Sequence, residues 1–106
     1  MTMSQKLARQ RQVTIGSNNL DGILSLPPQP KGLVIFAHGS GSSRHSPRNT
    51  QVAIRLQEVG LATLLFDLLS EAEASDRAQV FNIPLLAERL EEALDWALTD
   101  DDAKAL

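Results

Sequence analysis

A short glycine- and serine-rich segment carries the residues best suited to chemistry. Residues 38–43 read HGSGSS and follow a continuous apolar run, while Asp67 follows a second apolar run. Glycines let a backbone approach a ligand closely, and the N–H groups of such a loop can hold an anion, either an oxyanion or a phosphate. The segment has neither the lysine of a phosphate loop nor a full G-x-G-x-x-G. The residue types alone still do not decide whether the bound anion is an oxyanion or a phosphate.

Side chains near this segment offer further polar groups. Arg44 and His45 are candidate ligands for a substrate carboxylate, with a solvated loop as the alternative. A catalytic triad built from Ser40 or Ser42 with His45 and Asp67 is disfavoured, because the serine lies in a glycine-rich loop and nothing fixes the histidine tautomer. The acidic residues between positions 67 and 76 lack the spacing of a calcium loop, so we expect a solvated acidic loop and no metal site.

The elements that position these residues begin with a predicted β-hairpin. Apolar residues alternate between Val13 and Leu26, and a polar turn near residues 17–19 divides them. Prolines follow at positions 27, 28 and 30, and they end the second strand because proline cannot donate to the hydrogen-bond ladder.

Two strands of a parallel pair are predicted next. Residues 33–37 and 61–66 are continuous apolar runs, which are typical of parallel strands buried on both faces. A helix connects them, with Ser46 as its N-cap and Gly60 at its end. Ligands bind beyond the carboxyl ends of such strands, so the glycine-rich segment and Asp67 should lie at one edge of the sheet.

Apolar spacing defines the buried faces of two helices. The connecting helix should bury Val52, Leu56 and Val59. A second helix should run over residues 84–98 with Asn82 as its cap, and it should bury Leu86, Leu90, Ala93, Leu94 and Ala97. Its acidic residues and Arg89 should face solvent. Residues 100–106 then form a polar tail in which three aspartates mark a turn.

Length and composition restrict the class of protein. The 106 residues suffice for one small domain or part of a larger one, and they exclude a two-domain dehydrogenase. The absence of cysteine excludes disulfides and thiolate metal sites, and a net charge of -3 argues against a nucleic-acid partner. No apolar run could form a signal-peptide core or a membrane span. We therefore expect a cytoplasmic protein with a flexible stretch over residues 1–12 and a folded region over 13–106.

Several segments, taken in order, resemble a known family. The strand at 33–37 (LVIFA) runs into HGSGSS, and SPRN at 46–49, GLATLLFD at 60–67 and FNIPLLAERL at 81–90 follow. Together they resemble the third strand, oxyanion loop and following elements of the dienelactone-hydrolase-like α/β-hydrolases. The resemblance covers about residues 13–98. Domains of this kind are sometimes joined to phosphoribosyltransferase domains.

The resemblance implies an α/β fold holding the first part of an α/β-hydrolase sheet. It consists of a hairpin followed by β-α-β-α and stops before the nucleophile-elbow strand. In this family an N–H after the His-Gly pair helps to form the oxyanion hole, which by position falls on Ser40, with Gly41 as the second choice. His38, Gly39 and Asp67 would support the loop. The G-x-S-x-G nucleophile elbow is absent from this sequence, and with it the catalytic triad.

These observations predict an N-terminal fragment of a serine hydrolase. It would carry the oxyanion loop for hydrolysis of a small ester or lactone, need no cofactor and be inactive alone. The alternatives are an anion- or nucleotide-binding module that uses residues 39–43, and a non-catalytic partner that pairs through an open sheet. In the family's sheet order residues 33–37 would lack one neighbouring strand here, and we expect this apolar edge to drive self-association. No membrane or nucleic-acid partner is expected.

Overall fold

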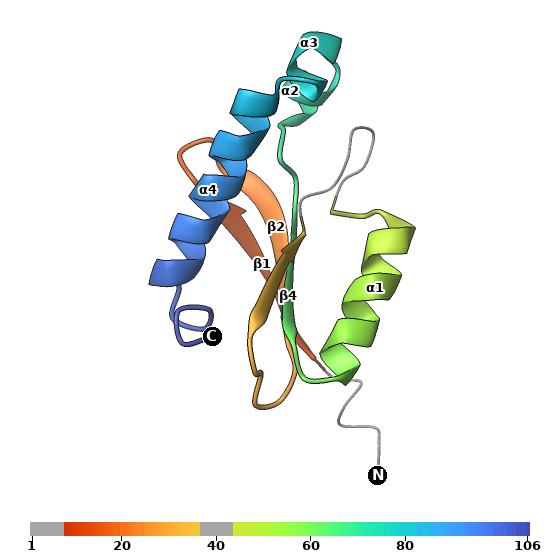
Figure 1. The fold of residues 1–106 in the computed structure, drawn as a ribbon, viewed down its shortest axis with the longest axis vertical. Coiled ribbons are helices and arrows are strands. Elements are labelled where there is room, and N and C mark those ends of the chain that lie inside the picture. The colour runs from red at the N-terminus through yellow and green to blue at the C-terminus, as the bar shows by residue number, and fades with distance from the viewer. Residues whose placement is uncertain (1–7, 37–43) are drawn as a thin grey trace.

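The computed structural model describes residues 8–36 and 44–106, which form a four-stranded mixed sheet with helices on both faces (Figure 1). In chain order the elements are β1 (Arg9–Ile15), β2 (Leu20–Leu26), β3 (Leu33–Phe36), α1 (Pro47–Glu58), β4 (Ala62–Phe66), α2 (Glu71–Ala74), α3 (Arg77–Val80) and α4 (Ile83–Thr99). The sheet order is β1-β2-β4-β3; of the three neighbouring pairs, β3–β4 is parallel and the other two are antiparallel. The predicted hairpin and parallel pair are confirmed. No helix in these described ranges is long and apolar enough to cross a membrane.

The hairpin is longer than its apolar pattern predicts. Its turn uses left-handed backbone at Gly16 (φ +73°) and Asn19 (φ +52°), and the Asn19 N–H donates to the Gly16 carbonyl at 3.2 Å. β1 begins at Arg9, so residues 9–12 belong to the sheet and not to the flexible stretch expected over residues 1–12. The cause is a long-range contact with the other end of the chain, which the local pattern does not contain.

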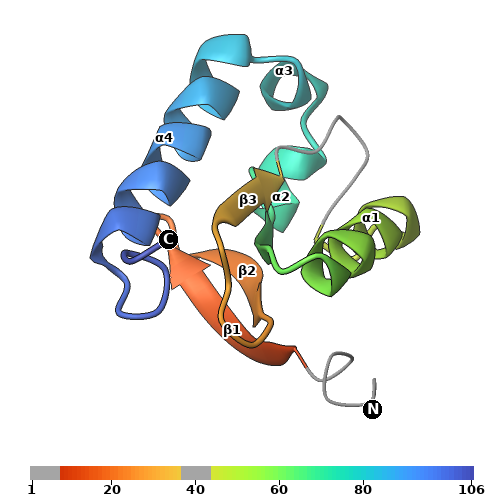
Figure 2. The ribbon, with the colours of Figure 1, turned by 60° about the horizontal axis from the view of Figure 1, so that its bottom comes forward.

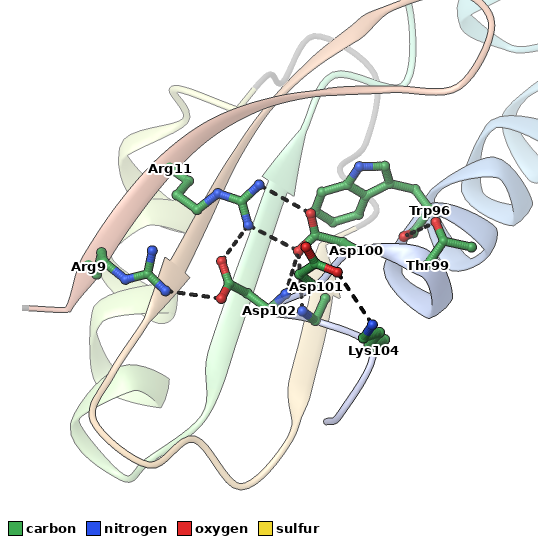
Figure 3. Close-up of polar contacts among 9 residues, drawn as sticks. Arg9, Arg11, Trp96, Thr99, Asp100, Asp101, Asp102 and Lys104 are labelled. Atoms are coloured by element: carbon green, nitrogen blue, oxygen red, sulfur yellow. Dashed lines mark hydrogen bonds and ion pairs between the residues drawn. The ribbon is translucent and has the colours of Figure 1, made fainter.

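An acidic turn after α4 holds the start of β1 (Figure 3). Arg11 Nη1 lies 3.0 Å from Asp100 Oδ2 and 2.6 Å from Asp102 Oδ2, and Arg9 Nη2 lies 3.1 Å from Asp102 Oδ1. Asp100 Oδ2 also accepts the backbone N–H groups of Asp102 and Ala103. The three aspartates form the predicted turn. Residues 100–106 are more than a polar tail, because Asp100 and Asp102 bind the first residues of β1.

The strands differ in burial according to their place in the sheet. β4 is central and buried throughout, and its Leu64 and Phe66 join Ile15 and Leu24 in the core beneath α4. All four residues of β3 are only half-buried, because this strand lies at the edge and has one neighbour. The expectation that residues 33–37 are buried on both faces is therefore wrong for Leu33–Phe36, and residue 37 lies outside the described residues. The expectation of an edge strand is confirmed for Leu33–Phe36.

Helices α1 and α4 begin at the predicted N-caps. Ser46 Oγ accepts the N–H of Asn49 at 3.4 Å, and Asn82 Oδ1 accepts the N–H of Leu85 at 3.2 Å. Gly60 follows α1 with φ +95°, a conformation that glycine adopts without steric cost.

The buried face of α1 differs from the predicted one. Ala53 is buried, and Gln57 Nε2 donates to Thr63 Oγ1 of β4 at 2.8 Å. Val52 and Val59 are exposed instead of buried. Leu56, the third residue of the predicted stripe, is half-buried. The buried face is therefore centred on Ala53 and Gln57, and apolar spacing predicted it only in part.

α4 covers the other face of the sheet (Figure 2). It buries Ala93 and Ala97 as predicted, and Trp96 is half-buried against the core. Leu94, expected in the same buried stripe, is exposed, whereas Arg89, expected in solvent, is buried.

Candidate functional site

The carboxyl ends of β3 and β4 lie at the same end of the sheet. This carboxyl edge is distinct from the lateral edge that β3 forms as the outer strand. The two strands are parallel, and Phe36 at the end of β3 pairs with Leu65 of β4. The next described residue after Phe36 is Arg44. Four of the predicted site residues lie outside the described residues: His38, Gly39, Ser40 and Gly41. Their roles in an oxyanion hole and its support therefore stay predictions.

Asp67 holds the chain where it returns to this edge. The Arg44 N–H donates to Asp67 Oδ1 at 2.7 Å, and the Arg44 guanidinium donates to Asp67 Oδ2. Asp67 is itself fixed, because its N–H donates to the Asp21 carbonyl at 2.9 Å. Phe36 and Arg44 are thus both attached to the end of β4.

These contacts define what Arg44, His45 and Asp67 can do. The Asp67 carboxylate is occupied by two donors of Arg44, an arrangement suited to supporting a loop. The Arg44 guanidinium contacts Asp67 and lies 3.8 Å from the Asp21 carboxylate. These two acids already neutralise the Arg44 charge in part, which weakens its attraction for a substrate carboxylate. His45 is exposed and directly precedes the helix cap Ser46.

A second arginine holds the loop that follows β4. Only 5% of the Arg89 side chain is exposed. Its Nη1 donates to the Leu68 carbonyl at 3.1 Å and to Glu73 Oε1 at 2.9 Å, and its Nη2 donates to Glu73 Oε2 at 2.7 Å. The Glu73 carboxylate also accepts the Ser70 N–H, and the Ser70 hydroxyl accepts the Glu73 N–H. The expected solvated acidic loop is only partly correct. Glu71 and Asp76 are exposed, but residues 71–74 form α2, Asp76 caps α3, and Glu73 is tied to α4.

The bidentate contact fixes the charge of both partners. The Arg89 guanidinium, together with the Ser70 N–H, lowers the pKa of Glu73 from 4.5 to about 2. The Glu73 carboxylate in turn raises the pKa of Arg89. Sequence reasoning missed this pair although two signals were present. Ser70 and Glu73 have capping-box spacing, and Arg89 lies four and eight positions before the buried Ala93 and Ala97.

Other features of the described residues lie away from this edge or offer no ligand set. Within residues 8–36 and 44–106, no group of three or more histidine and acidic residues could hold a metal ion. A surface pocket beside the acidic turn is lined by residues that include Arg9, Leu26, Pro27 and Asp102. Leu26 is the last residue of β2, which runs antiparallel to β4. The pocket therefore lies at the end of the sheet opposite to the carboxyl end of β4.

Comparison with known proteins identifies what this arrangement resembles. The solved structure of a dienelactone hydrolase from Anabaena variabilis ATCC 29413 is similar over 93% of this chain and 48% of its own chain, with 47% identity and a TM-score of 0.84. Two curated proteins of Mycobacterium tuberculosis, strains CDC 1551 / Oshkosh and H37Rv, are each 52% identical over 95 residues. Both are named "Putative phosphoribosyl transferase". No protein-family model matches the chain.

The chain is a mixed α/β unit that matches part of an α/β-hydrolase-like domain. This confirms the expected fold class. The chain spans about half the length of the hydrolase and 21% of the length of the curated relatives. This chain therefore matches only a minor part of the proteins named "Putative phosphoribosyl transferase". Their name does not confirm a hydrolase activity.

Proposed function

We propose that this chain supplies the oxyanion side of a serine-hydrolase site that acts on a small ester or lactone. The observation that supports this most strongly is its similarity to the Anabaena dienelactone hydrolase over 93% of the chain. In such a reaction a serine attacks the carbonyl carbon, and backbone N–H groups stabilise the charge that develops on the oxygen. By resemblance the Ser40 N–H is the first donor and the Gly41 N–H the second.

The remaining catalytic groups come from outside these 106 residues. No G-x-S-x-G occurs in the chain, so the nucleophile, acid and base belong to a complementary part. No cofactor takes part in this chemistry. We expect no stoichiometric labelling of the chain by a fluorophosphonate probe, and such labelling would contradict the absence of a nucleophile.

The described residues supply the support that an oxyanion loop requires. A donor stabilises a transition state only if it is held in place before the reaction, because reorganisation would consume the gain. Phe36 pairs with Leu65 of β4, and the Arg44 N–H donates to Asp67 directly after β4. Arg89 fixes the neighbouring loop at the same edge through Leu68 and Glu73. The loop that follows β4 is therefore held in place by charge-assisted hydrogen bonds.

A single-chain chimera tests the proposal. Residues 1–106 are fused to the part of the Anabaena enzyme that they do not match, and hydrolysis of a lactone and of p-nitrophenyl acetate is measured. Ser40→Pro removes the backbone N–H, whereas Ser40→Ala keeps it. We expect Ser40→Pro to lower kcat about 10²–10³-fold and Ser40→Ala to have little effect. Equal activity of the two folded variants would rule out the Ser40 N–H as a donor.

The name of the curated relatives favours one second candidate. A phosphoribosyl group carries a phosphate, and residues 39–43 form a glycine-rich segment before a helix, which suits an anion. Titration of the chain with inorganic phosphate and ribose 5-phosphate, followed by amide chemical shifts, tests this. Shifts of the segment together with an inactive chimera favour anion binding, and the absence of shifts at millimolar ligand removes it.

A further inference from the structure

α1 and α4 lie on opposite faces of the sheet. Side chains of consecutive residues in a strand point to opposite faces. Thr63 of β4 accepts a hydrogen bond from Gln57 of α1, whereas Leu64 lies in the core beneath α4. Figures 1 and 2 show the two helices on either side of the strands. Each helix therefore has an outer face that is turned away from the sheet, and the two outer faces point in different directions.

The outer face of α1 combines arginines with exposed valines. At about 100° per residue, four exposed residues lie within about 60° of one another around the helix axis: Arg48, Val52, Arg55 and Val59. The Arg55 side chain is 84% exposed, although its Nε lies 3.5 Å from Glu58 Oε1. The helix carries two arginines and one glutamate, so its net charge is positive. We call these four residues the basic stripe of α1.

The outer face of α4 combines exposed leucines with acids. Five exposed residues lie within about 120° around the helix axis: Glu88, Glu91, Leu94, Asp95 and Leu98. The helix contains four acidic residues and one arginine, and this arginine is buried and bound by Glu73. The charge that α4 turns outward is therefore negative. We call these five residues the acidic stripe of α4.

Charge decides which of these surfaces can pair between two copies of the chain. Pairing α4 with α4 would bring acids against acids, and pairing α1 with α1 would bring arginines against arginines, and like charges across an interface oppose association. Pairing α1 with α4 joins arginines to carboxylates and valines to leucines. Arg48 and Arg55 are seven positions apart, as are Glu88 and Asp95, so both charged pairs repeat after about 10.5 Å. The α1–α4 pairing is therefore the one that matches both charge and apolar surface.

We propose that the basic stripe of α1 docks on the acidic stripe of α4 in a second copy of this chain. Because the two stripes lie on opposite faces of the sheet, each copy uses one stripe in a contact and still presents the other. Such a heterologous contact allows further copies to add at both ends. The chain then forms assemblies of increasing size, and two copies cannot satisfy both stripes. The proposal is independent of the proposed function, because neither stripe contains a residue assigned to the hydrolase site.

The length of α1 limits the strength of each contact. Its 12 residues span about 18 Å, so the contact consists of one short pair of helices. A contact of this length buries less than about 1,200 Å², which is typical of transient complexes. The ion pairs lie at the surface, where salt screens them, with a screening length of about 3 Å at about 1 M. We therefore expect the mean mass to rise with protein concentration and to fall when NaCl is added.

Two variants block the stripes separately. Val52→Glu places an acid in the basic stripe, and Leu98→Lys places a base in the acidic stripe, and both positions are exposed. Masses are measured by sedimentation over a range of concentrations, and melting temperatures check that each variant folds. We expect each variant alone to associate at least about tenfold more weakly than the parent. Gln51→Glu adds the same charge about 100° around α1 and should weaken association less than about threefold.

A mixture of the two blocked variants gives the decisive measurement. Val52→Glu keeps the acidic stripe and Leu98→Lys keeps the basic stripe, so the mixture should associate although neither variant does so alone. A mixture that stays monomeric overturns the proposal. Undiminished assembly of both separate variants also overturns it, and indicates pairing through another surface such as the outer edge of β3. A parent chain that stays monomeric at about 1 mM overturns it as well.

Discussion

Replacing Glu73 with glutamine removes one charge from the contact between α4 and α2. Glutamine still suits a capping box, so the Ser70 contacts can persist, but Arg89 loses its counter-charge while only 5% of its side chain is exposed. The lowering of the Glu73 pKa from 4.5 to about 2 corresponds to about 3 kcal/mol, at about 1.36 kcal/mol per pH unit. Because the Glu73 side chain is 30% exposed, solvent screening reduces the expected loss to about 2 kcal/mol at neutral pH.

The effect of Glu73→Gln should depend on pH with a definite sign. The pKa of Glu73 is lower in the folded chain than in the unfolded chain, so its charge stabilises the fold fully above pH 4.5. This contribution is lost as the pH falls from 4.5 toward 2. Urea unfolding at pH 7 and at several values below 4.5 measures the difference between variant and parent. We expect the difference to shrink on acidification, with Glu71→Gln as the exposed control. A difference below about 0.5 kcal/mol at pH 7, or one independent of pH, refutes the reasoning.

Two further predictions concern the hairpin. Arg11→Gln should leave Asp100 without its counter-charge, destabilise the chain by about 1–2 kcal/mol and speed hydrogen exchange over residues 100–106. Lys104→Gln, at an exposed pair, is its control, and equal exchange in the two variants would count against the clamp. Gly16→Ala should destabilise by more than about 1 kcal/mol, because φ is +73° and the new Cβ meets Glu92. Gly32→Ala has its nearest atom at 3.6 Å and should be tolerated, so equal melting temperatures would contradict this account.

Features of the fold that depend on neighbouring residues could be predicted from the sequence. The hairpin, the parallel pair and the caps Ser46 and Asn82 each follow from residues a few positions apart. Contacts between distant residues could not be predicted in this way. From its own helix alone, Arg89 is expected to face solvent. Its partners Glu73 and Leu68 lie 16 and 21 positions away, so the local pattern does not show that Arg89 is buried against them.

The candidate site was predictable to a similar extent. Strand order places the end of β3 and Asp67 at one edge, as the parallel arrangement predicts. The choice of Arg44 as the partner of Asp67 depends on the path of the chain between them, which residue types alone do not define. The exposed Val52 and Val59 show the same limit, because helical spacing defines an apolar stripe but not the surface that it meets.

The contact between Arg11 and the acidic turn also bears on the order of folding. It joins residues 89 and 91 positions apart, and closing a flexible loop of that length costs about 4 kcal/mol of chain entropy. The hairpin closes across only a few residues and can form long before the two ends of the chain meet. We therefore expect the contact to form after the folding transition state, so that its loss accelerates unfolding and leaves the folding rate nearly unchanged. These ion pairs would then set the lifetime of the folded chain through its unfolding rate, and they would have little effect on the folding rate.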